Sequence, residues 1–583
     1  MRRVPASGVS RTLVLKESGN VLTQCTVADY LLHRLSELGI DTIFGVPGDY
    51  ILEFICAITD GAGPAWVGNC NELNAAYAAD GYARVKGAAA LVVTAGVGDL
   101  GAAGGVAGSY AENVPVVVIS GVPGSGNGPM GRPLVHHSLG DGDFRPFQRM
   151  FGEITTAQAV LTADNAPAEI DRLCRLVWLN KRPVYITLPA DVAVTLVARP
   201  ERQLDLRQDL SEQHELNDFL ARVAVAIQAQ ARTALLADIR VRQFGHTAVL
   251  NRLLSETGVP WASTWAAAWD LDISTSGYLG IYVGAGDGTN AVSDINDADV
   301  LIRLGSARDE FGTGRADPSY RGAELVDIHP VGATIGDRQF PTLRMPDAIA
   351  GLTKAIGSRH YASNGTARMR SHPPFNPEAD TGLTQDRFWE RFADYIRQGD
   401  TIVVDTGSCN LGLRSIGLPS GVSVLTQNMW GSIGWSLPAL LGANLADPSS
   451  RHILLIGDGA FALTAQEIST MLRSERAPLL VVLNNEGYLI EDIAGGRKMV
   501  CNDIWTWKYS ALADALDGRG AYKPLGLRVS TEGELDCALP EAERAQSDGR
   551  LVLLEVVLDR SDAPRLMRDI AAATGRRELG IRE

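Results

Sequence analysis

The chain has 583 residues and a formal net charge of −15, because 68 acidic residues outnumber 53 basic ones. This balance argues against nucleic acid or an anionic membrane surface as the main partner, and no run approaches the roughly 20 apolar residues of a membrane span. Such a length exceeds what one hydrophobic core supports and predicts about three domains. The seven cysteines are scattered without a Cys-x-x-Cys pair, which predicts a reduced, cytoplasmic protein.

Changes in composition divide the chain into segments. We interpret residues 1–20 as a disordered extension, because they lack the apolar segment of a signal peptide. Polar linkers then separate three domains. The expected segments are an N-terminal domain at 21–196, a middle domain at 215–356, a third domain at 383–565 and a C-terminal tail at 566–583.

Apolar runs alternate with helical patterns through all three domains. Thr26 has the residue type of an N-cap, and Val27, Leu31 and Leu35 share one face of the helix that it would open. The expected strands are 42–46, 66–68, 90–94, 116–120 and 184–188 in the first domain, 233–237, 300–304 and 323–328 in the middle domain, and 401–404, 422–425, 452–456, 479–483 and 551–557 in the third. This alternation predicts an α/β fold of three open-sheet domains with parallel sheets flanked by helices, in which the first and third domains use one architecture.

Two acidic residues of the first domain lie where chemistry could take place. Asp49 follows a strand and Gly48, and α/β proteins build sites at strand ends, although Asp is also a common turn residue. Glu72 opens an alanine-rich helix, and its position alone is explained by helix capping. Neither residue identifies a site without further evidence.

A glycine motif and a histidine pair follow in the same domain. Gly96, Gly98 and Gly101 match a dinucleotide-binding fingerprint, but the acidic residue expected about 20 positions later is absent, so we favour a close-packed loop. His136 and His137 are adjacent in an expected loop, where both side chains can reach one cleft. A proton-shuttle or metal-ligand role and a structural role remain open alternatives for the pair.

The third domain carries the most specific pattern. Gly457, Asp458 and Gly459 follow a buried apolar run, and Asn485 follows the next one. The glycines predict a tight turn before a helix whose N-terminus suits a diphosphate. Because neighbouring parallel strands end at one edge of the sheet, the carboxylate and the amide are expected to share a hard cation such as Mg²⁺. Glu491 lies close behind in an apolar run, where partial burial would suit acid chemistry, although a solvated helix face is the alternative.

Together these motifs resemble the thiamine-diphosphate-dependent 2-oxo acid decarboxylases, over nearly the whole chain from about residue 26 to 559. Gly457-Asp458-Gly459 with Asn485 resembles the diphosphate–magnesium motif of that family, and Gly487 supplies the expected carbonyl ligand. Asn71-Glu72 resembles the segment with the cofactor-activating glutamate. Gly48-Asp49-Tyr50, His136-His137 and Ile490-Glu491 resemble the acid–base set that distinguishes decarboxylases from acetolactate synthases.

The resemblance implies roles for these residues. Glu72 would hydrogen-bond a ring nitrogen of the aminopyrimidine, the Gly431 carbonyl would accept from its amino group, and Ile433 would support the bent cofactor. Asp49, His136, His137 and Glu491 would handle decarboxylation and protonation. The remaining contacts to the cofactor would come from Thr406, Gly457, Gly459, Ala460 and Tyr488, and the metal ligands would be Asp458, Asn485 and Gly487. The family also implies a homodimer or tetramer with active sites shared between chains.

Departures from the family pattern bear on the substrate. Ala494 stands where a bulky aliphatic residue is usual, and Phe311 stands where simple pyruvate decarboxylases have a tyrosine. Each methylene missing from a pocket wall corresponds to about 0.8 kcal/mol of contact that a larger substrate could recover. With Ile490 as a further wall residue, the sequence predicts a pocket for aryl or branched 2-oxo acids such as phenylpyruvate or indolepyruvate.

Two other functions remain possible at this stage. An acyloin-forming carboligase would use the same cofactor to join the aldehyde unit to a second aldehyde. A catalytically silent homologue would only bind the cofactor, but the simultaneous presence of Asp49, Glu72, His136, His137 and Glu491 argues against it.

Overall fold

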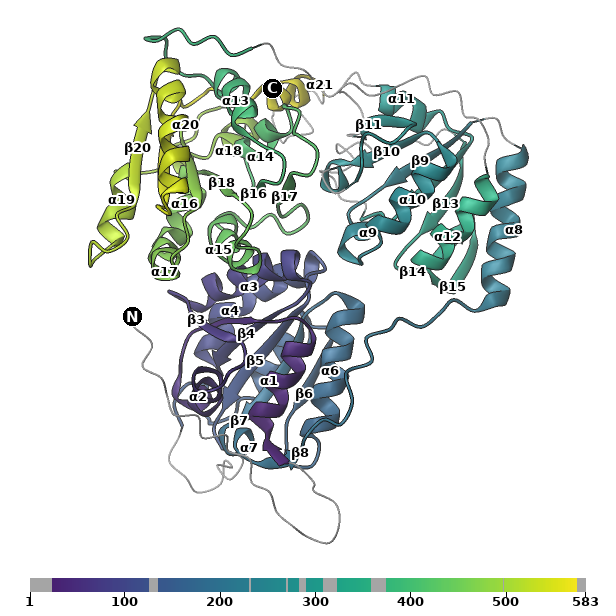
Figure 1. The fold of residues 1–583 in the computed structure, drawn as a ribbon, viewed down its shortest axis with the longest axis vertical. Coiled ribbons are helices and arrows are strands. Elements are labelled where there is room, and N and C mark those ends of the chain that lie inside the picture. The colour runs from purple at the N-terminus through teal and green to yellow at the C-terminus, as the bar shows by residue number, and fades with distance from the viewer. Residues whose placement is uncertain are drawn as a thin grey trace. The chain divides into compact units, whose positions relative to one another are not determined.

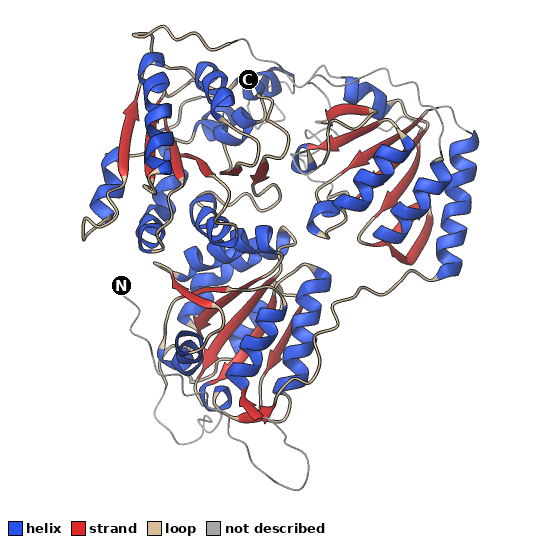
Figure 2. Ribbon diagram, in the orientation of Figure 1, coloured by secondary structure: helices blue, strands red, loops and turns tan. Residues whose placement is uncertain are grey.

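The structure is a computed structural model (Figure 1), and it describes residues 24–124, 135–229, 232–268, 271–282, 290–307, 322–357, 374–495 and 497–573. The extension expected at residues 1–20 lies outside the described residues. Two compact units are present, Met1–Arg207 and Gln208–Glu583, and the second contains two separate sheets. Within each part, strands are flanked by helices (Figure 2), which confirms the predicted α/β class.

The first unit is built on a six-stranded sheet in the order β3-β2-β4-β5-β7-β6, in which every pairing is parallel. Its strands are β2 (Thr42–Gly45), β3 (Ala65–Gly68), β4 (Ala89–Thr94), β5 (Val116–Val122), β6 (Ala157–Val160) and β7 (Val184–Pro189). Short strands β1 (Gln24–Thr26) and β8 (Leu196–Ala198) pair antiparallel beside it. β1, β6 and β8 were not predicted from the sequence.

Local sequence explains where the helices of this unit begin. Thr26 caps α1 as expected: its hydroxyl accepts from the Asp29 amide at 3.0 Å, and the Asp29 carboxylate completes a capping box. Asn71 caps α3 through the Asn74 amide at 2.8 Å. The helices are α1 (Val27–Glu37), α2 (Leu52–Asp60), α3 (Glu72–Lys86), α4 (Val97–Ala111), α5 (Arg145–Phe151), α6 (Ala166–Asn180) and α7 (Ala190–Ala193).

The glycine motif of this unit is closely packed, as predicted, but only Gly96 lies in a loop, because α4 begins at Val97 and contains Gly98 and Gly101. Gly96 has a φ of 78°, and a side-chain carbon there would lie 1.8 Å from the His137 carbonyl oxygen. Along α4, a carbon on Gly105 would lie 2.5 Å from the Ala76 side chain of α3. Small residues therefore let α3 and α4 approach closely, and no dinucleotide site is needed to explain the motif.

The middle sheet has the order β11-β10-β9-β12-β13-β14-β15. Its strands are β9 (Thr233–Ala237), β10 (Trp261–Thr264), β11 (Tyr278–Tyr282), β12 (Val300–Leu304), β13 (Glu324–Ile328), β14 (Val331–Ile335) and β15 (Arg338–Arg344). β14 and β15 run antiparallel, which the sequence did not predict, and the remaining pairings are parallel. Its helices are α8 (Gln213–Ala229), α9 (Arg240–Gln243), α10 (Thr247–Thr257), α11 (Asn290–Asn296) and α12 (Met345–Ile356).

The third domain is again a six-stranded parallel sheet, in the order β17-β16-β18-β19-β21-β20. Its strands are β16 (Thr401–Val404), β17 (Ser423–Leu425), β18 (His452–Gly457), β19 (Leu479–Asn484), β20 (Leu525–Val529) and β21 (Val552–Val557). Its helices are α13 (Gln385–Tyr395), α14 (Ser408–Leu413), α15 (Ser436–Ala446), α16 (Asp458–Thr464), α17 (Ile468–Arg473), α18 (Leu489–Ala494), α19 (Tyr509–Leu516), α20 (Glu532–Ser547) and α21 (Arg565–Ala573).

Two local expectations for the third domain need correction. No tight turn separates β18 from the next helix, because α16 begins at Asp458, and neither Gly457 nor Gly459 has a positive φ. Gly459 is instead required by packing, since an added side-chain carbon would lie 2.5 Å from the Tyr488 ring. The segment expected as a tail is helical in part, because α21 begins at Arg565.

Two further observations concern the cysteines and membrane insertion. All seven cysteines lie in the described part of the chain and none forms a disulfide. Among the described residues, no helix is both long enough and apolar enough to cross a membrane.

Candidate active site

In the first unit, Asp49 and the histidine pair form one cluster. Asp49 opens a short 3₁₀ turn after β2, and its carboxylate lies 3.0 Å from Nε2 of His136 and 3.9 Å from Nε2 of His137. The two imidazole centroids are 4.2 Å apart. The structure thus brings both histidines beside one carboxylate, and a carboxylate facing two imidazoles can relay protons.

Neighbouring groups hold this cluster in place. The Tyr50 hydroxyl lies 3.1 Å from Nδ1 of His136 and also 3.1 Å from its carbonyl oxygen. His137 has a φ of 65°, a costly conformation for a residue other than glycine. Its carbonyl packs against Gly96, where only glycine leaves room. Burial and the nearby Asp49 charge raise the pKa of Tyr50, so the hydroxyl stays protonated near neutral pH.

Glu72 is the first residue of α3, and its carboxylate lies against α4. Side-chain carbons added to Gly98 and Gly101 would come within 3.5 and 2.9 Å of the two carboxylate oxygens. The glycines of α4 therefore leave the space that the Glu72 carboxylate occupies. The sequence analysis considered the glycine motif and Glu72 separately, and it did not predict that the glycines make room for the carboxylate.

In the third domain, Asp458 lies at the carboxyl end of β18. The side chain is 2% exposed, and its oxygens accept the Gly459 amide at 2.9 Å and the Gly487 amide at 3.1 Å. Burial raises the pKa of Asp458 to about 6. β18 and β19 are neighbouring parallel strands, as the motif predicted, and this carboxylate also links the end of β18 to the loop after β19.

Asn485 and Gly487 follow β19 in a loop held by Arg560. The Asn485 amide nitrogen donates to the Arg560 carbonyl at 3.4 Å, and the Arg560 guanidinium donates to the Glu486 carbonyl. Glu486 has a φ of 60°, so this loop is strained. A side-chain carbon on Gly487 would collide with the guanidinium, which explains the glycine. Arg560 follows β21, and nothing in the sequence pattern singled it out.

The loop before α15 completes this edge of the sheet. Gly431 and Gly434 have φ values of 63° and 84°. A carbon on Gly431 would lie 3.9 Å from the Thr406 hydroxyl, and one on Gly434 would lie 3.0 Å from the Ala460 carbonyl oxygen. The resemblance assigned Thr406, Gly431 and Ala460 to one cofactor site, and the structure gathers them around one loop. Ile433 lies two residues after Gly431 in the same loop, and its side chain is half-buried.

Asp405 fixes this loop, and sequence reasoning missed it. The carboxylate accepts the Ser436 hydroxyl at 2.6 Å, the Ser436 amide at 3.2 Å and the Gly434 amide at 3.1 Å. Burial raises the pKa of Asp405 to about 6. A signal was available, because Asp405 directly follows a buried strand, as Asp458 does.

The donor set of the third domain fits a hydrated divalent cation and a diphosphate. Asp458, Asn485 and the Gly487 carbonyl offer a carboxylate, an amide and a peptide oxygen, which are the ligands that Mg²⁺ prefers. Desolvation dominates the raised pKa of Asp458, and a cation would offset that cost. An added carbon on Gly457 meets nothing within 4 Å, so space is left beside the start of α16.

The burial of the Glu491 side chain differs from the prediction. Its side chain is exposed in the described structure, whereas the next residue, Asp492, is buried and ion-paired with Arg560 at 2.8 Å. The partial burial expected at Glu491 is therefore found one position later. Ile490 is half-buried, the side chain of Ala494 lies outside the described set, and Phe311 lies outside the described residues.

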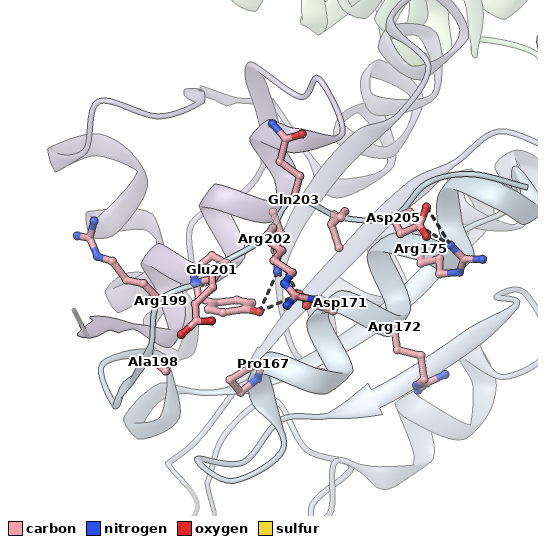
Figure 3. Close-up of a pocket in the computed structure, with 14 residues that line it drawn as sticks. Pro167, Asp171, Arg172, Arg175, Ala198, Arg199, Glu201, Arg202, Gln203 and Asp205 are labelled. Atoms are coloured by element: carbon pink, nitrogen blue, oxygen red, sulfur yellow. Dashed lines mark hydrogen bonds and ion pairs between the residues drawn. The ribbon is translucent and has the colours of Figure 1, made fainter. Parts of the chain in front are cut away.

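A separate pocket of about 530 Å³ opens on the first unit, between α1, α6 and residues 198–205 (Figure 3). None of the residues that line it was predicted as a site residue. Arg34 donates to both oxygens of Asp171, at 2.7 and 2.9 Å, and to the Tyr30 hydroxyl at 3.2 Å. The ion pair between Arg34 and Asp171 joins α1 to α6, so we assign it a structural role.

Comparison with known proteins agrees with this geometry. Models of the thiamine pyrophosphate enzyme family match three segments: the N-terminal TPP binding domain at residues 25–140, the central domain at 220–355 and the C-terminal TPP binding domain at 405–556. Thiamine pyrophosphate is another name for thiamine diphosphate. The chain belongs to the thiamine pyrophosphate enzymes.

Relatives narrow the family further. The chain is 42% identical over 550 residues to the alpha-keto-acid decarboxylase of Mycolicibacterium paratuberculosis, covering 94% of this chain and 96% of the relative. It is 39% identical over 558 residues to that of Mycobacterium ulcerans, covering 96% and 97%. It is 39% identical over 543 residues to that of Mycobacterium tuberculosis, covering 93% and 96%. Within the thiamine pyrophosphate enzymes, it belongs with the alpha-keto-acid decarboxylases.

Proposed function

We propose that this chain decarboxylates an aryl or branched 2-oxo acid to an aldehyde and CO₂ without oxidation, using thiamine diphosphate and Mg²⁺. The observation that supports this most is the acid–base cluster of Asp49, His136 and His137, because its Nε2 atoms converge on one carboxylate. A protein that only bound the cofactor would not need this proton relay. The relatives named alpha-keto-acid decarboxylase support the same reaction.

Each residue would have a limited task. Asp458, Asn485 and the Gly487 carbonyl would hold Mg²⁺ and, through it, the diphosphate. When bound, thiamine diphosphate supplies the electron sink that makes loss of CO₂ possible. Glu72 would keep a hydrogen bond at a ring nitrogen of the pyrimidine, and the Gly431 carbonyl would accept from its amino group. Glu491, Asp49 and the two histidines would carry protons for the product aldehyde.

The test of this function is a panel of substrates. Purified holoprotein should release CO₂ and free aldehyde from 2-oxo acids, and more rapidly from phenyl, indolyl or branched acids than from pyruvate. Release from none of them would contradict the proposal. A hydroxyketone as the main product when an aldehyde is also supplied would favour the carboligase instead.

The substrate preference rests on Ala494. Ala494→Ile restores a bulky residue, and it should shift the ratio of kcat/KM values toward smaller acids by several-fold, since about 0.8 kcal/mol is lost per displaced methylene. An unchanged ratio would mean that this residue does not limit the pocket.

We further propose that the active unit is at least a cytoplasmic homodimer whose sites are shared between chains. Resemblance to the family supports this proposal. If Glu72 and Asp458 of one site come from different chains, mixing inactive Glu72→Gln and Asp458→Ala proteins under subunit exchange should restore about a quarter of the activity. No recovery despite confirmed exchange would place each site in a single chain.

A further inference from the structure

Asp49, His136 and His137 also have the arrangement of metal ligands. One ligand atom from each residue lies within 4.8 Å of the other two. Two imidazoles and a carboxylate suit Zn²⁺ and related transition-metal ions. The all-oxygen donor set at Asp458 instead suits Mg²⁺. The chain therefore offers two sets of possible ligands with different chemical preferences.

The distances agree with a tetrahedral ion. With bonds of about 2.0–2.1 Å, neighbouring ligand atoms around Zn²⁺ lie about 3.3 Å apart. Nε2 of His136 lies 3.0 Å from Oδ2 of Asp49 and Nε2 of His137 lies 3.9 Å from Oδ1, so a small movement would bring one atom from each residue to that spacing. The two imidazole nitrogens can approach each other by rotation of partly exposed rings. Three ligands leave a fourth position for water.

Tyr50 provides the outer partner that a metal-bound histidine requires. Its single hydroxyl hydrogen can be donated to the His136 carbonyl at 3.1 Å, and the oxygen then accepts Nδ1–H of the same histidine at 3.1 Å. In that tautomer the Nε2 lone pair faces a carboxylate oxygen only 3.0 Å away. In that tautomer, a proton or a metal ion bound by both atoms would remove the repulsion between them.

The backbone prepares this set before any ion binds. The left-handed His137 and its contact with Gly96 keep the two imidazoles adjacent. The Ser138 hydroxyl donates to the Val135 carbonyl at 3.0 Å, and this hydrogen bond stabilises the loop that carries the two histidines. In the single chain the side chains of Asp49, His136 and His137 are 47, 60 and 30% exposed, so the residues of this chain leave their ligand atoms accessible to an ion.

We propose that Asp49, His136 and His137 bind one transition-metal ion of the Zn²⁺ class, separately from Mg²⁺, and that this ion reversibly switches the enzyme off. Inhibition follows because the ion occupies the lone pairs through which the cluster would exchange protons. The binding stands on geometry alone, whereas the inhibition rests on the proposed decarboxylase function.

Calorimetric titration of Mg²⁺-saturated holoenzyme with Zn²⁺ tests the binding. One ion per chain is expected, with binding lost in His136→Asn and in Asp49→Asn. Tyr50→Phe removes the outer partner and should weaken binding about 10–100-fold. His33→Asn is the matched control, because His33 is an exposed histidine beside Glu37, at 3.3 Å, without a second imidazole. Equal binding by wild type and His136→Asn would overturn the site.

Activity measurements test the switch. Zn²⁺ at the concentration that fills the site should stop CO₂ release under saturating Mg²⁺, and a chelator should restore it. Full activity with the site occupied would overturn the inhibition. A wild-type preparation that decarboxylates no 2-oxo acid would contradict the proposed function, and the calorimetric titration would still decide the metal site.

Discussion

The first unit and the third domain contain sheets with the same strand order, but the surroundings of one corresponding strand end differ. The order β3-β2-β4-β5-β7-β6 matches β17-β16-β18-β19-β21-β20, strand for strand. In this match β4 corresponds to β18. Each is followed by a glycine N-cap, Gly96 or Gly457, and a helix with an aspartate in its first turn, Asp99 or Asp458. Burial raises the pKa of both carboxyl groups to about 6.

What surrounds the two aspartates differs. Asp99 is enclosed by protein: it accepts the Gly96 amide at 2.9 Å and the Tyr185 hydroxyl at 3.1 Å. Within the described part of the chain, Asp458 accepts hydrogen bonds only from backbone amides, and the space beside Gly457 is open. One scaffold therefore produces a closed strand end that is filled by protein groups and an open one that leaves space beside the helix. The fold alone does not decide which is which.

The largest expected effect separates the two aspartates. Asp458→Ala should abolish Mg²⁺-dependent retention of thiamine diphosphate, with a loss of affinity greater than about 100-fold, because Asp458 is a direct ligand of Mg²⁺ in the site that we propose. Asp99→Asn should retain the cofactor. Cofactor bound after gel filtration with Mg²⁺ measures both. Tight retention by Asp458→Ala would mean that the open strand end is not the metal site.

The next largest effect concerns Glu72, the residue of the first unit that is expected to activate the cofactor. Glu72→Gln keeps the shape that Gly98 and Gly101 accommodate, so cofactor and Mg²⁺ should still bind. Exchange of the acidic thiazolium proton should slow by about 100-fold, because the carboxylate no longer assists it. Hydrogen–deuterium exchange followed by NMR checks this. Glu53→Gln, at an exposed position of α2, is the control, and equal rates in both variants would remove Glu72 from catalysis.

A third prediction concerns Asp99 and the pH dependence of the free energy of unfolding. The pKa of Asp99 rises from 3.8 in the unfolded chain to about 6 in the folded one. Below pH 3.8 the carboxyl group is protonated in both states. Between pH 3.8 and 6 the unfolded state loses its proton first, so the contribution of Asp99 to the free energy of unfolding falls as pH rises, by about 3 kcal/mol in total.

Asp99→Asn removes this dependence. The Asn oxygen can still accept the Gly96 amide, and the Tyr185 hydroxyl can accept from the Asn amide. The stability of the variant relative to wild type should therefore increase between pH 4 and 7, which urea denaturation at several pH values measures. A constant difference would show that Asp99 ionises as easily in the folded state as in the unfolded one.

The sequence predicted most of the fold because buried strands are short apolar runs. β9, β12 and β16 have the predicted bounds. β15 was missed because Arg338–Arg344 is a largely polar edge strand with an irregular pattern of exposure. The sequence could not show that Asp99 is buried, because an aspartate in the first turn of a helix is usually solvated.

At the candidate site, the types of residue were predictable and their environments were not. Asp458, Asn485 and the histidine pair could be found because their chemistry follows from strand ends and a loop. The sequence analysis chose Glu491 over Asp492 as the partly buried residue, and this was wrong because α18 has only six residues and shows no clear period. The position of Arg560 depends on the long-range approach of β21 to the loop after β19, which no local pattern encodes.

The smallest effect compares the two N-cap glycines. Gly457 has φ −77° and ψ 158°, which alanine adopts freely, and no atom lies within 4 Å of an added methyl group. Gly457→Ala should therefore change the free energy of unfolding by less than about 0.5 kcal/mol, while its methyl group narrows the space for a diphosphate and weakens cofactor binding. Gly96→Ala should cost about 1–3 kcal/mol, because its φ is positive and the His137 carbonyl is in the way.

Chemical denaturation of the cofactor-free proteins and titration with thiamine diphosphate measure the two effects separately. The pair distinguishes an open strand end from a closed one more directly than the aspartates do, since a methyl group carries no charge and offers no ligand. If Gly457→Ala binds the cofactor as wild type does, the space beside β18 does not receive the diphosphate. The open surroundings of Gly457 would then have no part in binding the cofactor.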